Sequence, residues 1–188
     1  MGSAGEGALV SDADIIAFWF ESHGERDWWG GKPEFDREIA DRFADIHARL
    51  ARGEGFSWRD DARGRLAEII VLDQFSRQLY RNDRRAFAQD GMALVLAQEA
   101  ITQRYDLVLR PERRAFLYMP LMHAESLVVQ EAAQPLLASL GGGTAEAAMG
   151  HLACIRRFGR FPKRNAALER VSTPEERAYI AETGDRMF

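Results

Sequence analysis

PEFDREIADRFADIHARL, residues 33–50, decides the fold class of this 188-residue chain. Its large apolar side chains recur at steps of three and four residues, and they are Phe35, Ile39, Phe43, Ile46 and Leu50. Steps of this size place all of them on one face of an α-helix, while the residues between them are mostly charged. Pro33 suits the first position of a helix, and Gly53 and Gly55 end the pattern. The stretch therefore predicts an amphipathic helix that packs one face on a core.

Helical spacing continues on both sides of this stretch. We expect helices at about 12–20, 61–80 and 90–106, and another that begins after Pro111, with Pro120 as a candidate kink. Each carries apolar residues on one side and polar residues on the other. The chain from residue 12 onward is therefore expected to be helical in most of its length.

The last part of the chain has its own start and stop signals. The segment GGGT at 141–144 breaks the chain before a further helix, which we expect Thr144 to cap and Gly159 to end. Thr173 and Glu176 have the spacing of a capping box, which predicts a short final helix.

These elements predict an all-α protein. No segment alternates apolar and polar residues over a strand length, so we expect no sheet. Short loops between helices favour an antiparallel array of helix pairs, either a compact bundle or an α-solenoid. We expect one helical domain over residues 12–188, preceded by a flexible segment at 1–11.

The composition is that of a soluble globular protein, with 46% hydrophobic and 29% charged residues. The net charge of −4 argues against nucleic-acid and membrane-surface partners, which favour basic chains. A single cysteine, Cys154, suits a reducing compartment, and the histidines lack metal-ligand spacing. The sequence also shows no signal peptide, membrane-spanning run, phosphate loop or dinucleotide fingerprint. We therefore expect a cytoplasmic protein without a metal or a cofactor.

Two charged residues fall on the apolar side of the helix expected at 61–80. Asp73 faces inward, and Arg77 follows it four residues later, within reach of an ion pair. Gln74 and Gln78 mark the polar arc of the same helix. We interpret Asp73 and Arg77 first as a buried structural pair, with a role in ligand binding as the alternative.

The segment YMPLMHAESLVVQ, residues 118–130, contains His123 and Glu125 two positions apart. On a regular helix such residues point away from each other. Glu125 then lies among apolar residues as a candidate buried carboxylate, whereas His123 belongs to a separate polar stripe that we interpret as solvated. The two can share a site only if Pro120 distorts the helix.

Three further residues have two interpretations each. His151 lies on an apolar helical arc, where a histidine needs a hydrogen-bond partner. It is either a satisfied core residue, which we favour, or a catalytic base. Trp28 and Trp29 form either a lid on the core, again favoured, or a platform for a ligand.

Three stretches carry a family resemblance, and they are VLDQFSRQLYR at 71–81, FLYMPLMHAES at 116–126 and HLACIRRFGRFPKRN at 151–165. In this order they resemble the signature blocks of a bacterial domain-of-unknown-function family, numbered 924, and the resemblance covers nearly the whole chain. It implies an all-helical fold of the tetratricopeptide-like superfamily, a right-handed α-solenoid, and brings no established activity, substrate or cofactor. The family pattern usually has histidine where this chain has Lys163. Because lysine is a poor base at neutral pH, we expect charge recognition rather than acid–base chemistry at this position.

The segment RFGRFPKRN at 157–165 gathers four cations around one glycine and one proline. Our leading hypothesis is a polar pocket that binds an anionic small molecule or a peptide carboxylate. We expect its ligand-binding residues to be Arg77, His123, Arg157, Arg160, Lys163, Arg164 and Asn165. In a purely structural version of this hypothesis, Asp73 and Glu125 neutralise the loop instead.

Two other function classes remain open. The first is a hydrolase or lyase in which His151 acts as base, Glu125 or Asp73 orients it, and the arginines hold the charge of the substrate. The second is a protein-interaction scaffold, which rests on fold analogy alone. Ligand identity and oligomeric state do not follow from the sequence.

Overall fold

The computed structural model describes residues 9–184, and within this range the chain forms helices and loops without a β-strand. The expectation of an all-α fold is confirmed. Most of the segment expected to be flexible, residues 1–11, lies outside the described range, and the single-domain expectation stays a prediction.

The N-terminal third supplies most of the aromatic core. Helix α1 (Asp12–Ala17) continues into the π-helical turn η1 (Phe18–Ser22), and the short α2 (Glu25–Trp28) leads to α3 (Pro33–Ala51). The stretch that predicted α3 is helical over its full length, and its five large apolar residues are all buried. Phe35 and Phe43 pack on the buried Phe18 of η1, and Phe35 also packs on the buried Trp19.

A continuous helical segment forms the centre of the molecule. It consists of α4 (Ala62–Ile69), the π-helical η3 (Ile70–Phe75) and α5 (Ser76–Leu79), and it follows the 3-10 turn η2 (Phe56–Asp60). Every residue from 64 to 76 is buried. The π-helical turn widens the helix at Asp73, and such turns are frequent at functional sites.

The next two helices end earlier than the sequence suggests. After η4 (Arg84–Phe87), α6 (Asp90–Thr102) stops before the 3-10 turn η5 (Tyr105–Val108), because Arg104 adopts a left-handed backbone with φ of 62°. Helix α7 (Pro111–His123) keeps Pro120 inside it and ends at His123, after which Ala124 is extended with ψ of 130°. The assumption of one helix through His123 and Glu125 was therefore wrong.

The C-terminal part contains α8 (Leu127–Ala138), α9 (Gly142–Phe158), the 3-10 turn η6 (Pro162–Arg164) and α10 (Pro174–Thr183). Gly159 ends α9 in the left-handed region as predicted, with φ of 71°. The predicted capping box at Thr173 is present at the start of α10. Thr144 does not cap α9, because the helix begins at Gly142 and Gly141 takes the cap position.

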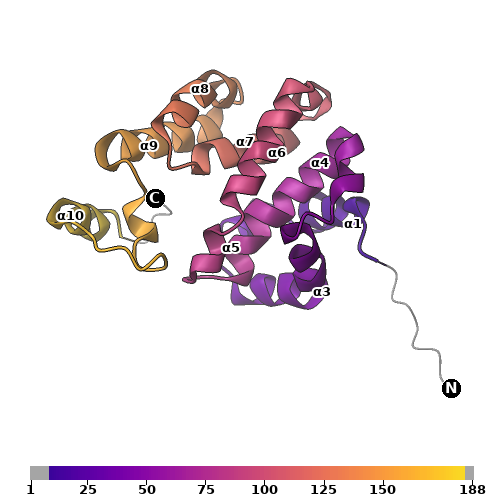
Figure 1. Ribbon diagram of the computed structural model, residues 1–188, viewed down its shortest axis with the longest axis horizontal. Coiled ribbons are helices and arrows are strands. Elements are labelled where there is room, and N and C mark those ends of the chain that lie inside the picture. The colour runs from indigo at the N-terminus through magenta and orange to yellow at the C-terminus, as the bar shows by residue number, and fades with distance from the viewer. Residues whose placement is uncertain (1–8, 185–188) are drawn as a thin grey trace.

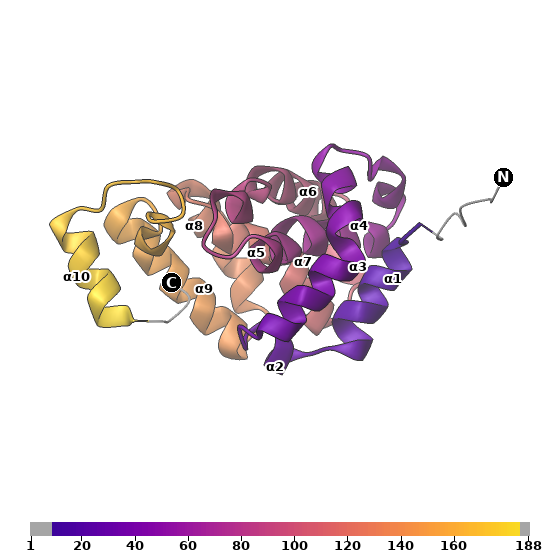
Figure 2. The ribbon, with the colours of Figure 1, turned by 90° about the horizontal axis from the view of Figure 1, so that it is seen from below.

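The helices form an elongated array (Figures 1 and 2). Helix α4 packs on α1, α6 and α7, and α7 in turn packs on α8 and α9. Helix α10 lies at the opposite end of the molecule from α1 and α3 (Figure 1). Within residues 9–184, none of the helices combines the length and the apolar character needed to cross a bilayer. The tetratricopeptide-like arrangement stays a prediction.

Candidate functional site

A cleft of about 620 Å³ is lined by residues from both the N-terminal and the C-terminal parts of the chain. Its walls come from α2, the end of η3, α5, α7, α9 and η6. Helix α7 fixes its long axis, because Glu112 near its start and His123 at its end both line the cleft. Eleven helical steps separate them, which corresponds to about 16 Å. Residues from the first turn of α9 and from α2 line the end of the cleft near Glu112. Figure 2 shows these two elements near each other.

One end of the cleft has an aromatic wall. The Trp29 ring stacks on Phe116 with ring centroids 5.9 Å apart and planes 9° apart, and 43% of Trp29 is exposed. Trp28 stacks on the buried Trp19, and its indole N–H donates to the backbone carbonyl of Trp19 at 3.1 Å. Trp28 therefore belongs partly to the core, as favoured from the sequence, while both indoles also line the cleft.

The other end is built on a buried carboxylate. Asp73 is fully buried, and its Oδ1 lies 2.8 Å from Nδ1 of His123 and 3.1 Å from Nη1 of Arg77. Burial alone would raise the pKa of Asp73, but the charges of Arg77 and His123 outweigh burial and lower it. An ionised carboxylate only accepts hydrogen bonds, so Nδ1 of His123 carries the proton and donates it. The other ring nitrogen of His123, Nε2, lies on the side away from Asp73.

Arg77 and Arg164 share a second carboxylate behind the cleft wall. Nη2 of Arg77 donates to Oδ2 of Asp90 at 3.1 Å, and Nη1 of Arg164 donates to the same oxygen at 3.0 Å. Nη2 of Arg164 donates to the backbone carbonyl of His123 at 3.0 Å, which ties η6 to the end of α7. Burial lowers the pKa of Arg164, and the nearby charge of Arg77 lowers it further. The two guanidinium groups are thus close enough to repel each other.

The imidazoles of His123 and His151 both line the cleft, with ring centroids 5.8 Å apart. Burial lowers the pKa of both rings, and for His151 to about 3, where the charges of His123 and of nearby arginines add to the effect. Nδ1 of His151 lies 2.7 Å from the carbonyl oxygen of Ala147 on its own helix. His151 is therefore buried and hydrogen-bonded, as favoured from the sequence. The carboxylate–imidazole pair of this site is formed by Asp73 and His123, and not by His151 with Asp73 or Glu125.

The expectation that Glu125 is a buried carboxylate was wrong. Its side chain is 25% exposed and forms a two-pronged ion pair with Arg170, with distances of 2.7 and 2.9 Å. It also accepts the backbone N–H of Phe161 at 2.7 Å. Because α7 ends at His123, Glu125 lies on the connection to α8 and secures the loop before η6.

Three of the residues expected to bind a ligand contact α10 instead. Arg160 forms a two-pronged ion pair with Glu176 at 2.7 and 2.9 Å, and the amide of Asn165 donates to the same carboxylate at 3.2 Å. Arg157 pairs with Glu175 at 2.9 Å on the surface. None of the three is among the residues that line the cleft. Lys163 and Arg164, by contrast, line the cleft, although Nζ of Lys163 also donates to the backbone carbonyl of Gly184 at the end of α10, at 2.9 Å.

Sequence reasoning missed several residues of the cleft. Gln74 and Gln78 were assigned to a polar arc, but both are buried and line the cleft. Within residues 9–184, Oε1 of Gln78 has no hydrogen-bond partner. The polar character of this arc was still informative, because polar side chains line a polar cleft as well as a solvent-exposed surface. No local sequence pattern marks Asp90 as a site residue, since only the tertiary fold brings it to Arg77 and Arg164.

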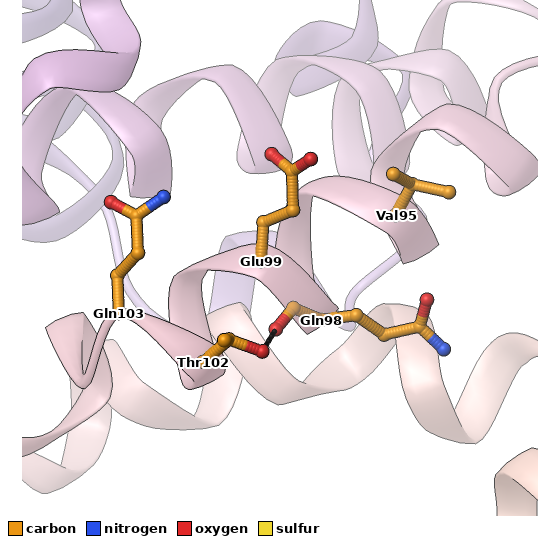
Figure 3. A pocket seen from close by; sticks show the side chains of 5 residues that line it. All are labelled: Val95, Gln98, Glu99, Thr102 and Gln103. Atoms are coloured by element: carbon orange, nitrogen blue, oxygen red, sulfur yellow. Dashed lines mark hydrogen bonds between the residues drawn. The ribbon is translucent and has the colours of Figure 1, made fainter.

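A second, smaller hollow of about 300 Å³ lies on α6 (Figure 3). Its lining residues are Val95, Gln98, Glu99, Thr102 and Gln103. All come from one helix and its last turn, and all are exposed. No second element contributes a side chain, so this hollow does not enclose a ligand.

Across residues 9–184, no three His, Cys, Asp or Glu side chains lie together in a way that would hold a metal ion. The polar end of the cleft instead offers guanidinium, ammonium, imidazole and carboxamide groups. These are groups that bind anions and hydrogen-bonding ligands.

Comparison with known proteins agrees with the resemblance seen in the sequence. The model of a family described as bacterial proteins of unknown function, DUF924, matches residues 15–184. The chain belongs to the DUF924 family. Among solved structures, it is similar to a protein of unknown function, ATU0120, from Agrobacterium tumefaciens. The two are 39% identical with a TM-score of 0.87, and the match covers 91% of this chain and 97% of that chain. No curated protein matches.

Proposed function

We propose that this DUF924 protein binds a small organic anion in the cleft between α7 and α9, with the negative group at the His123 end. The observation that carries the proposal is the distribution of charge around that end. The cleft is lined there by the cations Arg77, Lys163 and Arg164, whereas the carboxylates that pair with the two arginines, Asp73 and Asp90, lie behind them. An anion in the cleft would contact the guanidinium group of each ion pair and not its carboxylate.

The crowding of the two arginines supports an anion at this end. Burial and a neighbouring cation lower the pKa of the Arg164 guanidinium, which means that they disfavour its charged form. A negative group nearby stabilises that charged form. Guanidinium groups match carboxylate and phosphate geometry with paired hydrogen bonds. Carboxylate and phosphate are therefore the groups that we expect the ligand to carry.

The remainder of the cleft suits an apolar or ring-shaped body. An aromatic wall is formed there by Trp28, Trp29 and Phe116, and the methionines of α7 add flexible apolar surface. The cleft volume lies within the range of about 300–1,000 Å³ that is usual for small-molecule pockets. The buried Oε1 of Gln78 would accept a hydrogen bond from a hydroxyl or amide N–H of the ligand. We propose a cytoplasmic location, which the single buried thiol of Cys154 favours.

The proposal is tested by thermal unfolding with matched ligands. Benzoate and octanoate are each compared with the neutral amide of the same carbon skeleton. A ligand that binds the folded state raises the melting temperature, so we expect the acids to raise it and the amides to leave it unchanged. Equal shifts for an acid and its amide would show that charge is not recognised, and the proposal would fail.

A further inference from the structure

We propose that the cleft is also a hydrolytic site, in which His123 is the general base and Asp73 is its positioning residue. This inference rests on the proposed anion site, since the anion places the substrate. The substrate class is an acyl ester that carries a second, anionic group. The reaction needs only water as co-reactant, and the cleft opens to solvent beside the exposed Trp29.

The geometry of the two residues supports this role. Nδ1 of His123 donates to a fully buried carboxylate at 2.8 Å, which fixes both the ring orientation and the tautomer. In that tautomer Nε2 carries a lone pair, and it lies on the side of the ring away from Asp73. A carboxylate that holds Nδ1–H is the arrangement that makes an imidazole an effective base at Nε2.

The position of Asp73 has a structural cause. It lies in the π-helical turn η3, where the backbone departs from the regular α-helical repeat. His123 is the last residue of α7, and Arg164 holds its carbonyl oxygen from the other side. His123 is thus held from outside its own helix, and Asp73 is held by Arg77 and Gln74 of its own helical segment.

The surroundings keep His123 in its basic form at neutral pH. Burial lowers its pKa, Arg77 lowers it further, and Asp73 and Asp90 act in the opposite direction. Arg164 from η6 and His151 from α9 also lie beside it. His151 has a pKa of about 3 and is neutral above that pH.

The proposed step balances without a further reagent. A water oxygen forms a bond to the acyl carbon while Nε2 of His123 takes one water proton, and the carbonyl π electrons move to the carbonyl oxygen. The cations of the cleft stabilise that negative oxygen. When the carbonyl re-forms, the ester C–O bond breaks, and the leaving oxygen takes the proton from Nε2. The products are one carboxylic acid and one alcohol.

The experiment uses two chromogenic esters, para-nitrophenyl acetate and the para-nitrophenyl monoester of succinate. We expect the full-length protein to hydrolyse the succinate ester faster than free imidazole does at equal concentration. Relative to the protein-free rate of each ester, it should accelerate the succinate ester by a larger factor than the acetate ester. His123→Gln should lower kcat/KM by about 100-fold or more, the usual size of a general-base contribution. His23→Gln, which removes an imidazole outside the cleft, should leave the rate unchanged.

Two further measurements keep the test decisive if His123→Gln folds poorly. The wild-type rate should rise with pH through a single pKa below the ordinary histidine value of 6.5 and then level off. Asp73→Asn should lower kcat and move that pKa further down, because the carboxylate raises it; a purely structural role would not move the pH profile. A wild-type rate no higher than that of imidazole, or an unchanged rate in His123→Gln, overturns the inference.

These failures are distinguishable from a failure of the binding proposal. If benzoate and octanoate stabilise the protein while the esters are not hydrolysed, the anion site stands and the hydrolytic role falls. If neither acid stabilises the protein, the anion site itself is wrong.

Discussion

Oδ1 of Asp73 and Nδ1 of His123 lie 2.8 Å apart, although fifty residues separate them in the chain. The contact joins the π-helical turn of the central helix to the end of α7. It also brings Arg77 to the wall of the cleft, since Arg77 shares the Asp73 carboxylate. The same buried carboxylate thus supports the fold and orients the site.

Removing the charge of Asp73 should cost much of the stability. Asp73→Asn leaves Arg77 facing a neutral amide in the interior, and breaking a buried ion pair costs about 3–5 kcal/mol. Urea unfolding at neutral pH measures the loss. Asp45→Asn, at an exposed position of α3, is the control and should change the free energy of unfolding by less than about 0.5 kcal/mol. Equal stability of the two variants would contradict the assignment of Asp73.

The stability of the protein should fall in mild acid because of His151. Its folded-state pKa is about 3, against 6.5 as the ordinary value, so the unfolded chain takes up the proton first. The stability that depends on neutral His151 is complete above about pH 6.5 and is lost as the pH falls toward 3. His151→Gln should flatten the decline of the unfolding free energy between these pH values. A slope identical to that of the wild type would show that His151 does not titrate in this way.

The attachment of α10 should depend on Glu176 and not on its neighbour Glu175. Glu176 accepts from Arg160, Asn165 and the backbone N–H of Thr173, and its pKa is lowered to about 2 by the hydrogen bonds from Arg160 and Thr173. The stabilisation is complete above the ordinary value of 4.5 and is lost as the pH falls toward 2.

Glu176→Gln should therefore lower the melting temperature at neutral pH and expose α10 to proteolysis. Glu175→Gln removes only a surface pair with Arg157, and such pairs are worth about 0–1 kcal/mol. If both variants melt at the wild-type temperature, the Arg160–Glu176 contact does not anchor α10.

Two glycine substitutions should have different effects on stability. A Cβ at Gly64 would collide with the backbone carbonyl of Trp58, which cannot move without disturbing η2. Gly64→Ala should therefore destabilise the protein by more than about 1 kcal/mol. At Gly91, in the first turn of α6, a Cβ meets nothing within 4 Å, and Gly91→Ala should be neutral or stabilise by up to about 1 kcal/mol. Chemical denaturation of both variants checks the pair, and a stable Gly64→Ala would mean that η2 is not packed as described.

The sequence predicts the helices better than it predicts the site. The spacing of large apolar residues in α3 places them on one face only if the segment is an α-helix, and the segment is an α-helix with that face buried. The turns at Gly159 and Thr173 depend on local backbone chemistry and were also predictable. Asp73 was placed correctly because an acidic residue on an apolar face has to point inward.

His123 was misplaced because helical periodicity holds only while the helix continues. Helix α7 ends at His123, so the angle calculated between His123 and Glu125 had no meaning. The pairing of Arg160 with Glu176 and of Arg164 with Asp90 joins residues far apart in sequence. No local pattern distinguishes a cation that anchors α10 from one that faces the cleft.

The most direct test of the anion site compares two cations of the same loop. Lys163 lines the cleft, whereas Arg157 lies outside it and pairs with Glu175. Each is replaced by glutamine, and benzoate binding is measured by calorimetric titration of the wild type and both variants. A charge-assisted hydrogen bond is worth about 1.5–3 kcal/mol, so Lys163→Gln should weaken binding by about tenfold or more. Arg157→Gln should bind as the wild type does. Equal affinities for Lys163→Gln and the wild type, or an equal loss in both variants, would contradict an anion site at this end of the cleft.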